Sequence, residues 1–541
     1  MLRRDLLRVA LGSAVALTLS ACTSAAPNSG GAAAPTNANS APATVAPSSA
    51  APRPGGTLTL GLPNDVIDLD PLRSRAFVDR DVHYQMYDSL VRVQPDGTII
   101  PWLADSWDTS SDARTVTFKL RKDVTYHDGT QFDAESARWN LDRYRLTPDS
   151  ARSGELASID SVEVVDPSTL RLNLKAPFSP LLAQLVDRAS MMLSRPIVEA
   201  GGDDFTRKPF KAGTGPFILT ESVKDDHMTL QKNPNWWGRD RAGSKQPYID
   251  TLIVKPIANS DVRTTNLRTG NIDLTNAVAG KDISILKTES GLSYQQAPGL
   301  AWYGLSINRA PGFPFQDARA VKAIAMAIDR QEIIDKVYLG SASVGFGALA
   351  PPHFAFDSSF KPFPAPDPDG ARKLIDDMGK GPLTFEFLLP SGDPLQSQLG
   401  QLIQAQLQKA GIQPQLAQLD SAEILKQQVD HSYKGMILYT WSGRIDPDGN
   451  VYDQVYTGRP FNDMSYSNAQ VDQLLDQQRT TSDQSRRTDL LRQAEKIYAL
   501  DDPAKIFYGF PSVQLAAAKK VQGLELYPDG RLRMQTAWIA G

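Results

Sequence analysis

The sequence predicts an α/β protein with a partly parallel sheet and helices on both of its faces. The first observation is that helical patterns alternate with short apolar runs through the second half of the chain. The helical patterns cover 371–378, 395–410, 471–478 and 490–500, and the apolar runs cover 383–389 and 436–439. The second observation is that Gly379 and Gly411 stand where helices end, a position that favours glycine.

The first half of the chain predicts a similar mixture of elements. Asp133 is expected to cap a helix in which Ala137, Leu141 and Tyr144 fall on one face at i, i+4 and i+7. A second helix is expected over 79–90. Strand patterns cover 57–61, 115–121, 161–165 and 170–174.

Composition is that of an ordinary globular protein. The chain has 541 residues, 41% hydrophobic and 22% charged, which suggests roughly three domains of about 150 residues. With 57 Lys and Arg against 61 Asp and Glu, the net charge is −4, so no basic excess points to nucleic acid. The single cysteine, Cys22, excludes an internal disulfide framework and a Cys-based zinc site.

The N-terminus predicts export. Arginines at 3, 4 and 8 precede an apolar run at 9–19 that is too short to span a bilayer. Residues 19–22, Leu-Ser-Ala-Cys, resemble a bacterial lipobox, so 1–22 is expected to be a lipoprotein signal peptide with Cys22 lipidated. The alternative is an unmodified thiol after a plain signal peptide. Residues 3–8 also resemble a twin-arginine motif without its usual Phe, which leaves the export route open.

Residues 23–54 predict a disordered tether. The segment consists of Ala, Pro, Ser, Thr, Asn and Gly with one Val and one charge, so it has too little apolar area to offset the entropy of ordering. No later apolar run is long enough to cross a membrane. We therefore expect a lipid anchor as the only membrane contact, with the folded body on the extracytoplasmic side, in the periplasm or at the cell surface.

A series of short motifs carries a resemblance to a known family. They are Asp-Ser-Trp at 105–107, Phe-Lys-Leu-Arg-Lys-Asp-Val at 118–124, His-Asp-Gly-Thr at 127–130, Gly-Thr-Gly-Pro-Phe at 213–217, Asn-Pro-Asn-Trp-Trp at 233–237, and the segments 267–274 and 317–324. In this order they resemble the solute-binding proteins of peptide and nickel ABC transporters, the extracellular solute-binding family 5. The resemblance runs from about Gly56 to the C-terminus.

The resemblance implies a two-lobe periplasmic-binding-protein fold of type II, similar to cluster C, with a hinge near 301–303 and 507–509. It implies lobe I at 55–85, 212–300 and 505–541, an extra subdomain at 86–211 and lobe II at 301–504. The implied function is to capture a peptide or peptide-like solute in a cleft between the lobes and to deliver it to an ABC permease and its ATPase. A monomer is expected. A nickel chelate, an opine or an oligosaccharide are alternative solutes, and a receptor that signals through a partner is another alternative.

The segment 439–450 is the expected ligand loop, because it follows the apolar run 436–439 and ligands bind beyond the carboxyl ends of strands. Trp441 offers apolar contact. In peptide-binding relatives an Asp after this Trp binds the α-amino group of the ligand, and here the resemblance places Arg444 there. A guanidinium suits an acid group, such as that of an acidic or modified peptide or an opine. The alternative is that Arg444 pairs with Asp446 or Asp448 and stiffens the loop.

Five further residues complete the candidate site or its alternatives. Asp446 accepts from an amine of the ligand or, with Pro447, forms a turn. Trp302 and Tyr303, beside the expected hinge, form the cleft floor or pack in the core. Arg75 and Phe77, in the loop after Pro71, are weaker candidates.

Catalysis has little support in the sequence. The histidines at 83, 127, 227, 353 and 431 have no zinc-ligand spacing, and no Gly-x-Ser-x-Gly elbow or Walker loop is present. A surface hydrolase that uses Asp446 and Asp448 is the alternative from another class, although a Pro-Gly turn frames such a pair poorly. We expect no enzyme, no catalytic or metal-binding residue and no cofactor; His431 as a lone nickel-chelate ligand stays open.

Overall fold

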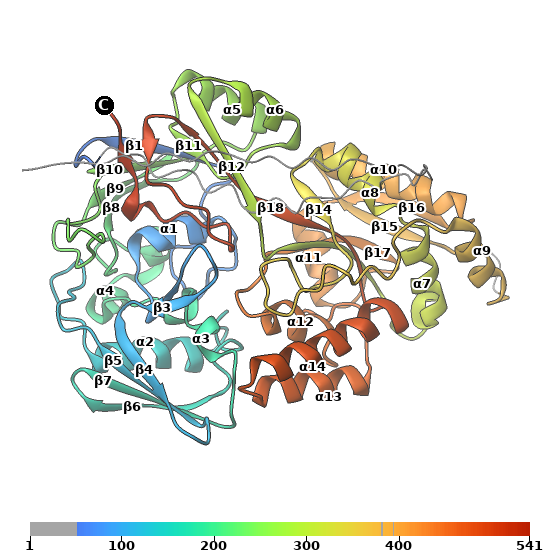
Figure 1. The fold of residues 1–541 in the computed structure, drawn as a ribbon, viewed down its shortest axis with the longest axis horizontal. Helices are drawn as coiled ribbons and strands as arrows, with labels where there is room; N and C mark the ends of the chain where they lie inside the picture. Colours follow the sequence, from blue (N-terminus) through green and yellow to red (C-terminus); the bar gives the residue numbers. More distant parts are fainter. Residues whose placement is uncertain (1–50, 380–381, 393) are drawn as a thin grey trace, which may run out of the picture. The chain divides into compact units, whose positions relative to one another are not determined.

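The structure, a computed structural model, describes residues 51–379, 382–392 and 394–541 (Figure 1). The predicted signal peptide, Cys22 and nearly all of the predicted tether lie outside the described residues. Residues 51–54, the end of the tether, are exposed and have no regular structure. Within the described part, every helix is too short or too polar to cross a membrane.

Strand β18 (Ile506–Ala518) connects two halves of a twelve-stranded sheet (Figure 1). Its first half pairs with β13 (Trp302–Ile307) and β14 (Ala342–Val344), and its second half pairs with β11 (Leu274–Thr275) and β12 (Leu292–Pro298). We call lobe I the part whose core comes from 58–292 and 515–537, and lobe II the part whose core comes from 302–510. One strand of 13 residues thus belongs to both lobes.

The sheet of lobe I is mixed. Strand β1 (Thr57–Leu62) lies between β10 (Thr251–Pro256) and β11, parallel to both, and β9 (His227–Lys232) and β8 (Phe217–Val223) continue the sheet in antiparallel order. Alternate side chains of β1 enter the core, as the sequence predicts for a strand. Helices α5 (Ser260–Thr269) and α6 (Ile283–Thr288) belong to this lobe.

A second, four-stranded antiparallel sheet lies within the predicted extra subdomain. Its strands, in spatial order, are β4 (Ala104–Thr109), β5 (Thr115–Leu120), β7 (Thr169–Leu174) and β6 (Ile159–Asp166). Helix α2 (Ala134–Leu146) packs on this sheet and buries the predicted face. The Asp133 carboxylate accepts from the Ser136 backbone N–H in a capping box, so the predicted helix start is confirmed.

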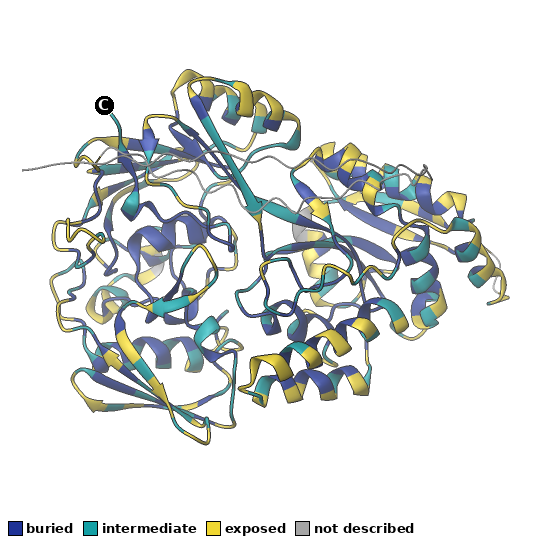
Figure 2. Ribbon diagram, in the orientation of Figure 1, coloured by how far each residue is buried: buried dark blue, intermediate teal, exposed yellow. Residues whose placement is uncertain are grey.

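Lobe II is the part for which the alternation of helices and strands was predicted. Strand β15 (Thr384–Pro390) runs parallel to β16 (Gln413–Leu419) and to β17 (Met436–Trp441), while β13 is antiparallel to β17. Helices pack on both faces and form separate cores, so the partly parallel sheet is confirmed. These helices include α7 (Ala318–Ala327), α9 (Pro368–Asp376), α10 (Pro394–Lys409), α13 (Ala469–Thr480) and α14 (Gln484–Lys496). Strands are mostly dark blue and outer helix faces yellow in Figure 2.

Shorter elements connect these layers. They are α1 (Asp79–Met86), β2 (Val91–Val93), β3 (Ile99–Pro101), α3 (Leu181–Gln184), the turn Arg188–Ser190, α4 (Arg195–Ala200), the turn Gly202–Thr206, α8 (Arg330–Ile333), α11 (Ser421–Val429), α12 (Asp448–Val455), β19 (Val521–Gln522) and β20 (Trp538–Ile539).

Two boundaries differ from the sequence-based expectation. The helix predicted over 79–90 ends at Met86, because Tyr87 adopts an extended conformation. The segment after Trp441 was predicted to be a loop throughout, but helix α12 begins at Asp448. The Asp446 carboxylate accepts from the Asp448 N–H at 2.9 Å, so the Asp-Pro pair starts a helix rather than continuing a loop.

Asp88 explains the aromatic motifs of the sequence. Its carboxylate accepts hydrogen bonds from the indoles of Trp102, Trp236 and Trp237 at 2.7, 3.1 and 3.2 Å. Burial raises the pKa of Asp88, and the hydrogen bonds from the indoles oppose that rise. The two tryptophans of the Asn-Pro-Asn-Trp-Trp segment are therefore linked to Trp102 through Asp88, which lies two residues after the end of α1.

We predict that Asp88→Ala lowers the free energy of unfolding by about 3 kcal/mol, because hydrogen bonds to a buried charge are lost and indole N–H groups lose their acceptor. Urea unfolding followed by tryptophan fluorescence measures the change. Asp108→Ala, an exposed position on β4, is the matched control with an expected change below about 0.5 kcal/mol. Equal stability of the two variants would contradict the assignment.

Candidate functional site

The loop that leads from β17 to α12 contacts lobe I. Ile445 packs against the hydrophobic core of lobe I, although it belongs to the lobe II part of the chain. A second contact lies at Ser179, whose N–H and hydroxyl donate to the carbonyls of Arg479 and Thr481 at 2.8 and 2.5 Å. The Arg479 guanidinium also lies over the ring of Phe178. The two lobes therefore meet at the C-terminal end of α13 and at the predicted ligand loop.

Arg444 is the most distinctive residue of this loop. Its guanidinium lies 4.7 Å from the ring centre of Trp441 and donates to the Ser442 hydroxyl at 3.1 Å and the Gly443 carbonyl at 2.8 Å. Among the described residues it forms no ion pair with a carboxylate. It is a half-buried cation whose remaining N–H groups are available to a ligand.

The backbone of Arg444 is fixed from two sides. Its N–H donates to the Asn450 side-chain oxygen at 2.7 Å, and its carbonyl accepts from Nε2 of His353 at 2.9 Å. Nδ1 of His353 accepts from the Ala350 N–H at 2.9 Å, so the imidazole is neutral. Burial lowers the pKa of His353 to about 4, which keeps this neutral form at physiological pH.

Glycines make the loop conformation accessible. Gly443 has a φ of 76°, and a Cβ there would stand 2.4 Å from the carbonyl carbon of Leu300. A Cβ on Gly449 would stand 2.6 Å from Cβ of Arg444. The Asn450 amide donates to the carbonyls of Leu300 and Ala348 at 2.8 and 3.0 Å. The loop therefore has little freedom to reorient Arg444.

Asp446 and Asp448 do not pair with Arg444, so that alternative is wrong. Asp446 forms a two-pronged ion pair with Arg487 at 2.7 and 2.9 Å, and Asp448 forms one with Arg479 at 2.8 and 2.9 Å. Both carboxylates are buried, and burial raises the pKa of Asp448. Each therefore fixes the start of α12 to the helices α13 and α14. These contacts give Asp446 a structural role. Its contact with an amine of the ligand stays a prediction.

The face of lobe I near this loop is rich in charge. Burial lowers the pKa of Arg444, and the charges of Glu155, Arg80, Arg188 and Asp187 also act on it. All four belong to lobe I. Arg444 is thus within electrostatic range of charged groups of the other lobe.

The hinge aromatics lie in the two cores of lobe II. Trp302 is wholly buried, stacks on Tyr439 with 5.3 Å between ring centres and meets Phe507 edge-on. Tyr303 points to the opposite face of β13 and stacks on Tyr338 at 4.7 Å. Their surroundings are those of packing residues, and a role in the cleft floor stays a prediction for both.

Arg75 and Phe77 lie at the surface of the loop that enters α1. Phe77 is 47% exposed, and the Arg531 guanidinium lies 3.3 Å from its ring centre. Arg75 is exposed. Neither contacts the loop of Arg444 through an interaction found among the described residues, so their contact with a ligand also stays a prediction.

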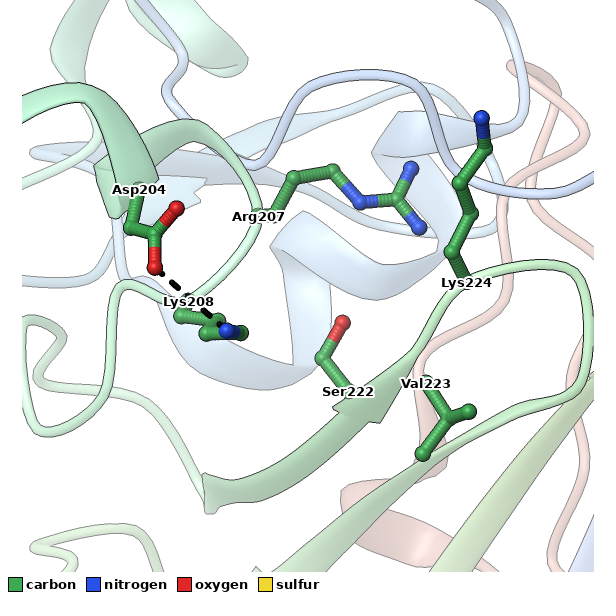
Figure 3. Close-up of a pocket in the computed structure, with 6 residues that line it drawn as sticks. All are labelled: Asp204, Arg207, Lys208, Ser222, Val223 and Lys224. Carbon is green, nitrogen blue, oxygen red and sulfur yellow. Dashed lines mark hydrogen bonds and ion pairs between the residues drawn. The ribbon is translucent and has the colours of Figure 1, made fainter.

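A separate hollow of about 600 Å³ lies on lobe I, between the turn Gly202–Thr206 and the end of β8 (Figure 3). Two of its three cations have nearby carboxylates: Arg207 pairs with Asp65 at 2.9 Å and Lys208 with Asp204 at 3.4 Å. None of the predicted site residues lines it. The hollow is therefore distinct from the candidate site.

Comparison with known families decides the class of the protein. The model for bacterial extracellular solute-binding proteins, family 5 Middle, matches residues 98–463. The chain belongs to this family. The resemblance found in the sequence motifs is confirmed, and the protein is a solute-binding protein.

Similar proteins agree with this class. The glutathione-binding proteins GsiB of Shigella boydii and Escherichia coli K12 are 27% identical over 473 residues, which cover 85% of this chain and 90% of theirs. Among solved structures, DppA of Helicobacter pylori with the peptide STSA has a TM-score of 0.80 and 25% identity over 90% of this chain and 99% of its own.

A more distant structure shows the same fold. AppA of Bacillus subtilis with a nonapeptide has a TM-score of 0.79 and 20% identity over 91% of this chain and all of its own. The two-lobe fold of periplasmic binding proteins is thus confirmed, and these similar proteins are binding proteins rather than enzymes. The lobe and subdomain boundaries and the site residues stay predictions.

The arginines of lobe I near Arg444 were missed by sequence reasoning. Arg80, Arg152 and Arg188 lie far apart along the chain, and each follows or precedes ordinary polar residues. Only their burial, at 4% exposure each, distinguishes them from surface arginines. No local motif carried that information.

We predict that His353→Gln reduces the loss of stability on acidification. The folded-state pKa of His353 is about 4 and the ordinary value 6.5, so its contribution is complete above pH 6.5 and is lost as pH falls toward 4. The expected difference is about 3 kcal/mol across that window. Urea unfolding at several pH values between 4 and 7.5 measures it.

The control for this prediction is His227→Gln. His227 is half-buried beside the exposed acids Asp226 and Glu221, and hydrogen bonds to them raise its pKa, so its replacement should leave the acid loss in place. An acid loss in His353→Gln as large as in the unsubstituted protein would show that the His353 imidazole is not the group responsible.

Proposed function

We propose that this protein is the solute-binding component of an ABC importer and that it captures a peptide-like solute between its lobes. The family and the names of the similar proteins, which bind glutathione and peptides, support this proposal. We further propose that Cys22 anchors it to the membrane by lipid, that the folded body is extracytoplasmic and that it acts as a monomer. Its partners are then a permease and an ATPase.

The observation that carries the proposal is the unpaired guanidinium of Arg444 on the loop after β17. A planar guanidinium binds a carboxylate through two parallel hydrogen bonds. The adjacent Trp441 adds apolar area beside it, and its own indole N–H is used by the Gly449 carbonyl at 3.2 Å. We propose that Arg444 binds an acid group of the solute and that Trp441 packs against the solute.

The mechanism is capture and delivery without a chemical step. The solute enters the open cleft, the lobes rotate about the predicted hinge near 301–303 and 507–509, and the closed form docks on the permease. The solute favours the closed form only to the extent that it binds that form more tightly. The hydrolase alternative needs Asp446 and Asp448 as a free pair, whereas an arginine holds each of them.

Other solutes remain alternatives within the same fold. A nickel chelate or an opine is the ligand in two proteins of similar structure, NikZ with Ni(L-His) and AgaA with agropinic acid. Among the residues that the structure describes, no group of three or more His, Cys, Asp or Glu could hold a metal ion. A neutral oligosaccharide would leave Arg444 without an anion, so an acidic peptide or opine is favoured.

We predict that acidic or amine-blocked peptides, glutathione or opines raise the melting temperature, and that Arg444→Gln weakens their binding about 30-fold or more. Thermal-shift screening and calorimetric titration measure both effects. Arg486→Gln, an exposed arginine of the same lobe, is the matched control. Equal affinity of both variants for free-amine peptides would overturn the role of Arg444 and leave a general peptide binder.

We predict that Cys22→Ser transfers the protein from the membrane fraction to the soluble fraction, because the thiol that receives the lipid is lost. Fractionation of cells that express each form measures the distribution, with Ser29→Ala as the control. Retention of Cys22→Ser in the membrane fraction would contradict the lipid anchor.

A further inference from the structure

Three arginines of lobe I converge next to the loop of Arg444. The Arg152 and Arg188 guanidinium groups both donate to the Ser74 carbonyl at 3.1 Å, and Arg188 also donates to the Ser74 hydroxyl at 3.2 Å. Arg80 pairs with Asp187 at 2.7 Å, and Asp187 precedes Arg188 in the chain. Each arginine is 4% exposed.

The carboxylates that neutralise these arginines are few. Asp187 serves both Arg80 and, at 3.9 Å, Arg188, while Glu155 bonds to Arg152. The Arg80 and Arg188 guanidinium groups hold the pKa of Asp187 below its usual range against the effect of burial, so Asp187 is ionised.

Two further acids lie nearby. Asp79 accepts from the Ser74 hydroxyl and from the Ile67 N–H, each at 2.8 Å. Asp529 is paired with Arg533 at 2.8 Å and is 3.5 Å from Arg80. Asp529 and Arg533 therefore neutralise each other.

The remaining balance is positive. Arg80, Arg152, Arg188 and Arg444 carry four positive charges, and Asp187, Glu155 and Asp79 supply three negative charges when all are ionised. One positive charge is left over, and among the described residues Arg444 is the member of the four with no carboxylate at ion-pair distance, although the charges of Glu155 and Asp187 act on it.

Hydrogen bonding in the cluster is also incomplete. Nε of Arg80, Arg152 and Arg188 is buried, and within the described part of the chain none of these atoms has a hydrogen-bond partner. Buried donors without acceptors are unusual because their desolvation is not compensated. Burial and repulsion by Arg152 lower the pKa of Arg188 to about 10, which shows how crowded the positive charges are.

We infer that Arg444 and the cluster of Arg80, Arg152 and Arg188 form one anion site divided between the lobes, which a carboxylate of the solute completes. The inference rests on the proposed function and extends it, because it names the charge that the solute must carry at the lobe boundary. The solute is a peptide-like carboxylate, and its acid group is bound from both lobes.

The divided site couples closure to the charge of the solute. In the structure the charges of Arg80 and Arg188 act on Arg444 across the lobe boundary, and like charges in a poorly hydrated site repel when no anion lies between them. A carboxylate between them turns that repulsion into attraction. The unliganded protein therefore favours the open form, and a neutral analogue of the solute leaves it open.

The test measures the distance between the lobes in the full chain. Cys22→Ser removes the single cysteine, and Leu146→Cys and Val429→Cys then place one label on each lobe, at positions 62% and 67% exposed. Solute that co-purifies is removed by unfolding and refolding. Pulsed electron resonance gives the distance distribution at 20 mM and 500 mM NaCl, with and without glutathione or its diethyl ester as probes.

We expect the unliganded protein at low salt to be mainly open, and either 500 mM salt or Arg444→Gln to raise its closed fraction at least threefold. Glutathione should close the unsubstituted protein, and its diethyl ester should not. Arg188→Gln should act like Arg444→Gln, whereas Arg195→Gln, an exposed arginine of lobe I, should change nothing.

The outcomes separate the inference from the proposed function. Unliganded distances that depend neither on salt nor on Arg444 would overturn the divided site, even if acidic solutes bind. Failure of every carboxylate-bearing solute to bind would instead overturn the proposed function. Closure by glutathione and by its diethyl ester to the same extent would overturn the coupling of closure to charge.

Discussion

The guanidinium of Arg444, held without a carboxylate partner at the boundary between the lobes, is the constraint on which the functional account depends. A partly buried charge without a counter-ion costs free energy. The contacts of His353 and Asn450 with its backbone fix where Arg444 stands in the loop. A half-buried charge at the boundary between the lobes, with no carboxylate in ion-pair contact among the described residues, is explained most simply by a ligand of opposite charge.

The two acids of the same loop have a structural role. Asp446 and Asp448 each engage one arginine of α13 or α14, and these pairs fix the start of α12. Because both acids are satisfied, the loop can present Arg444 without neutralising it. Within a few residues the loop thus contains two acids that form structural ion pairs and the arginine proposed to bind the solute.

Much of the fold could be predicted from the sequence, because periodicity and capping are local signals. The face of α2, its Asp133 cap and the parallel strands of lobe II followed directly from them. Helix α12 was missed since Asp, Gly and Asn in its first turn resemble a loop.

The site could be predicted only in part, for a physical reason. Trp441 ends a recognisable strand and Arg444 follows it, so position drew attention to the loop, and the family resemblance then singled out Arg444. Arg152 and Arg188 come together at Ser74 and Arg80 joins them through Asp187, only by tertiary packing, and no spacing in the sequence reveals it. Likewise, the Trp-Trp pair at 236–237 was noticed as a motif, but its acceptor, Asp88, was not.

The most direct test of the central claim compares a peptide with its C-terminal amide, each bound to the unsubstituted protein and to Arg444→Gln. Calorimetric titration of the four combinations gives the coupling free energy between Arg444 and the acid group. The account predicts a coupling of about 2 kcal/mol or more. Either change alone removes the charge-assisted pair, so the second change then has little further effect. Additive losses, with a coupling near zero, would show that Arg444 does not bind the acid group of the solute.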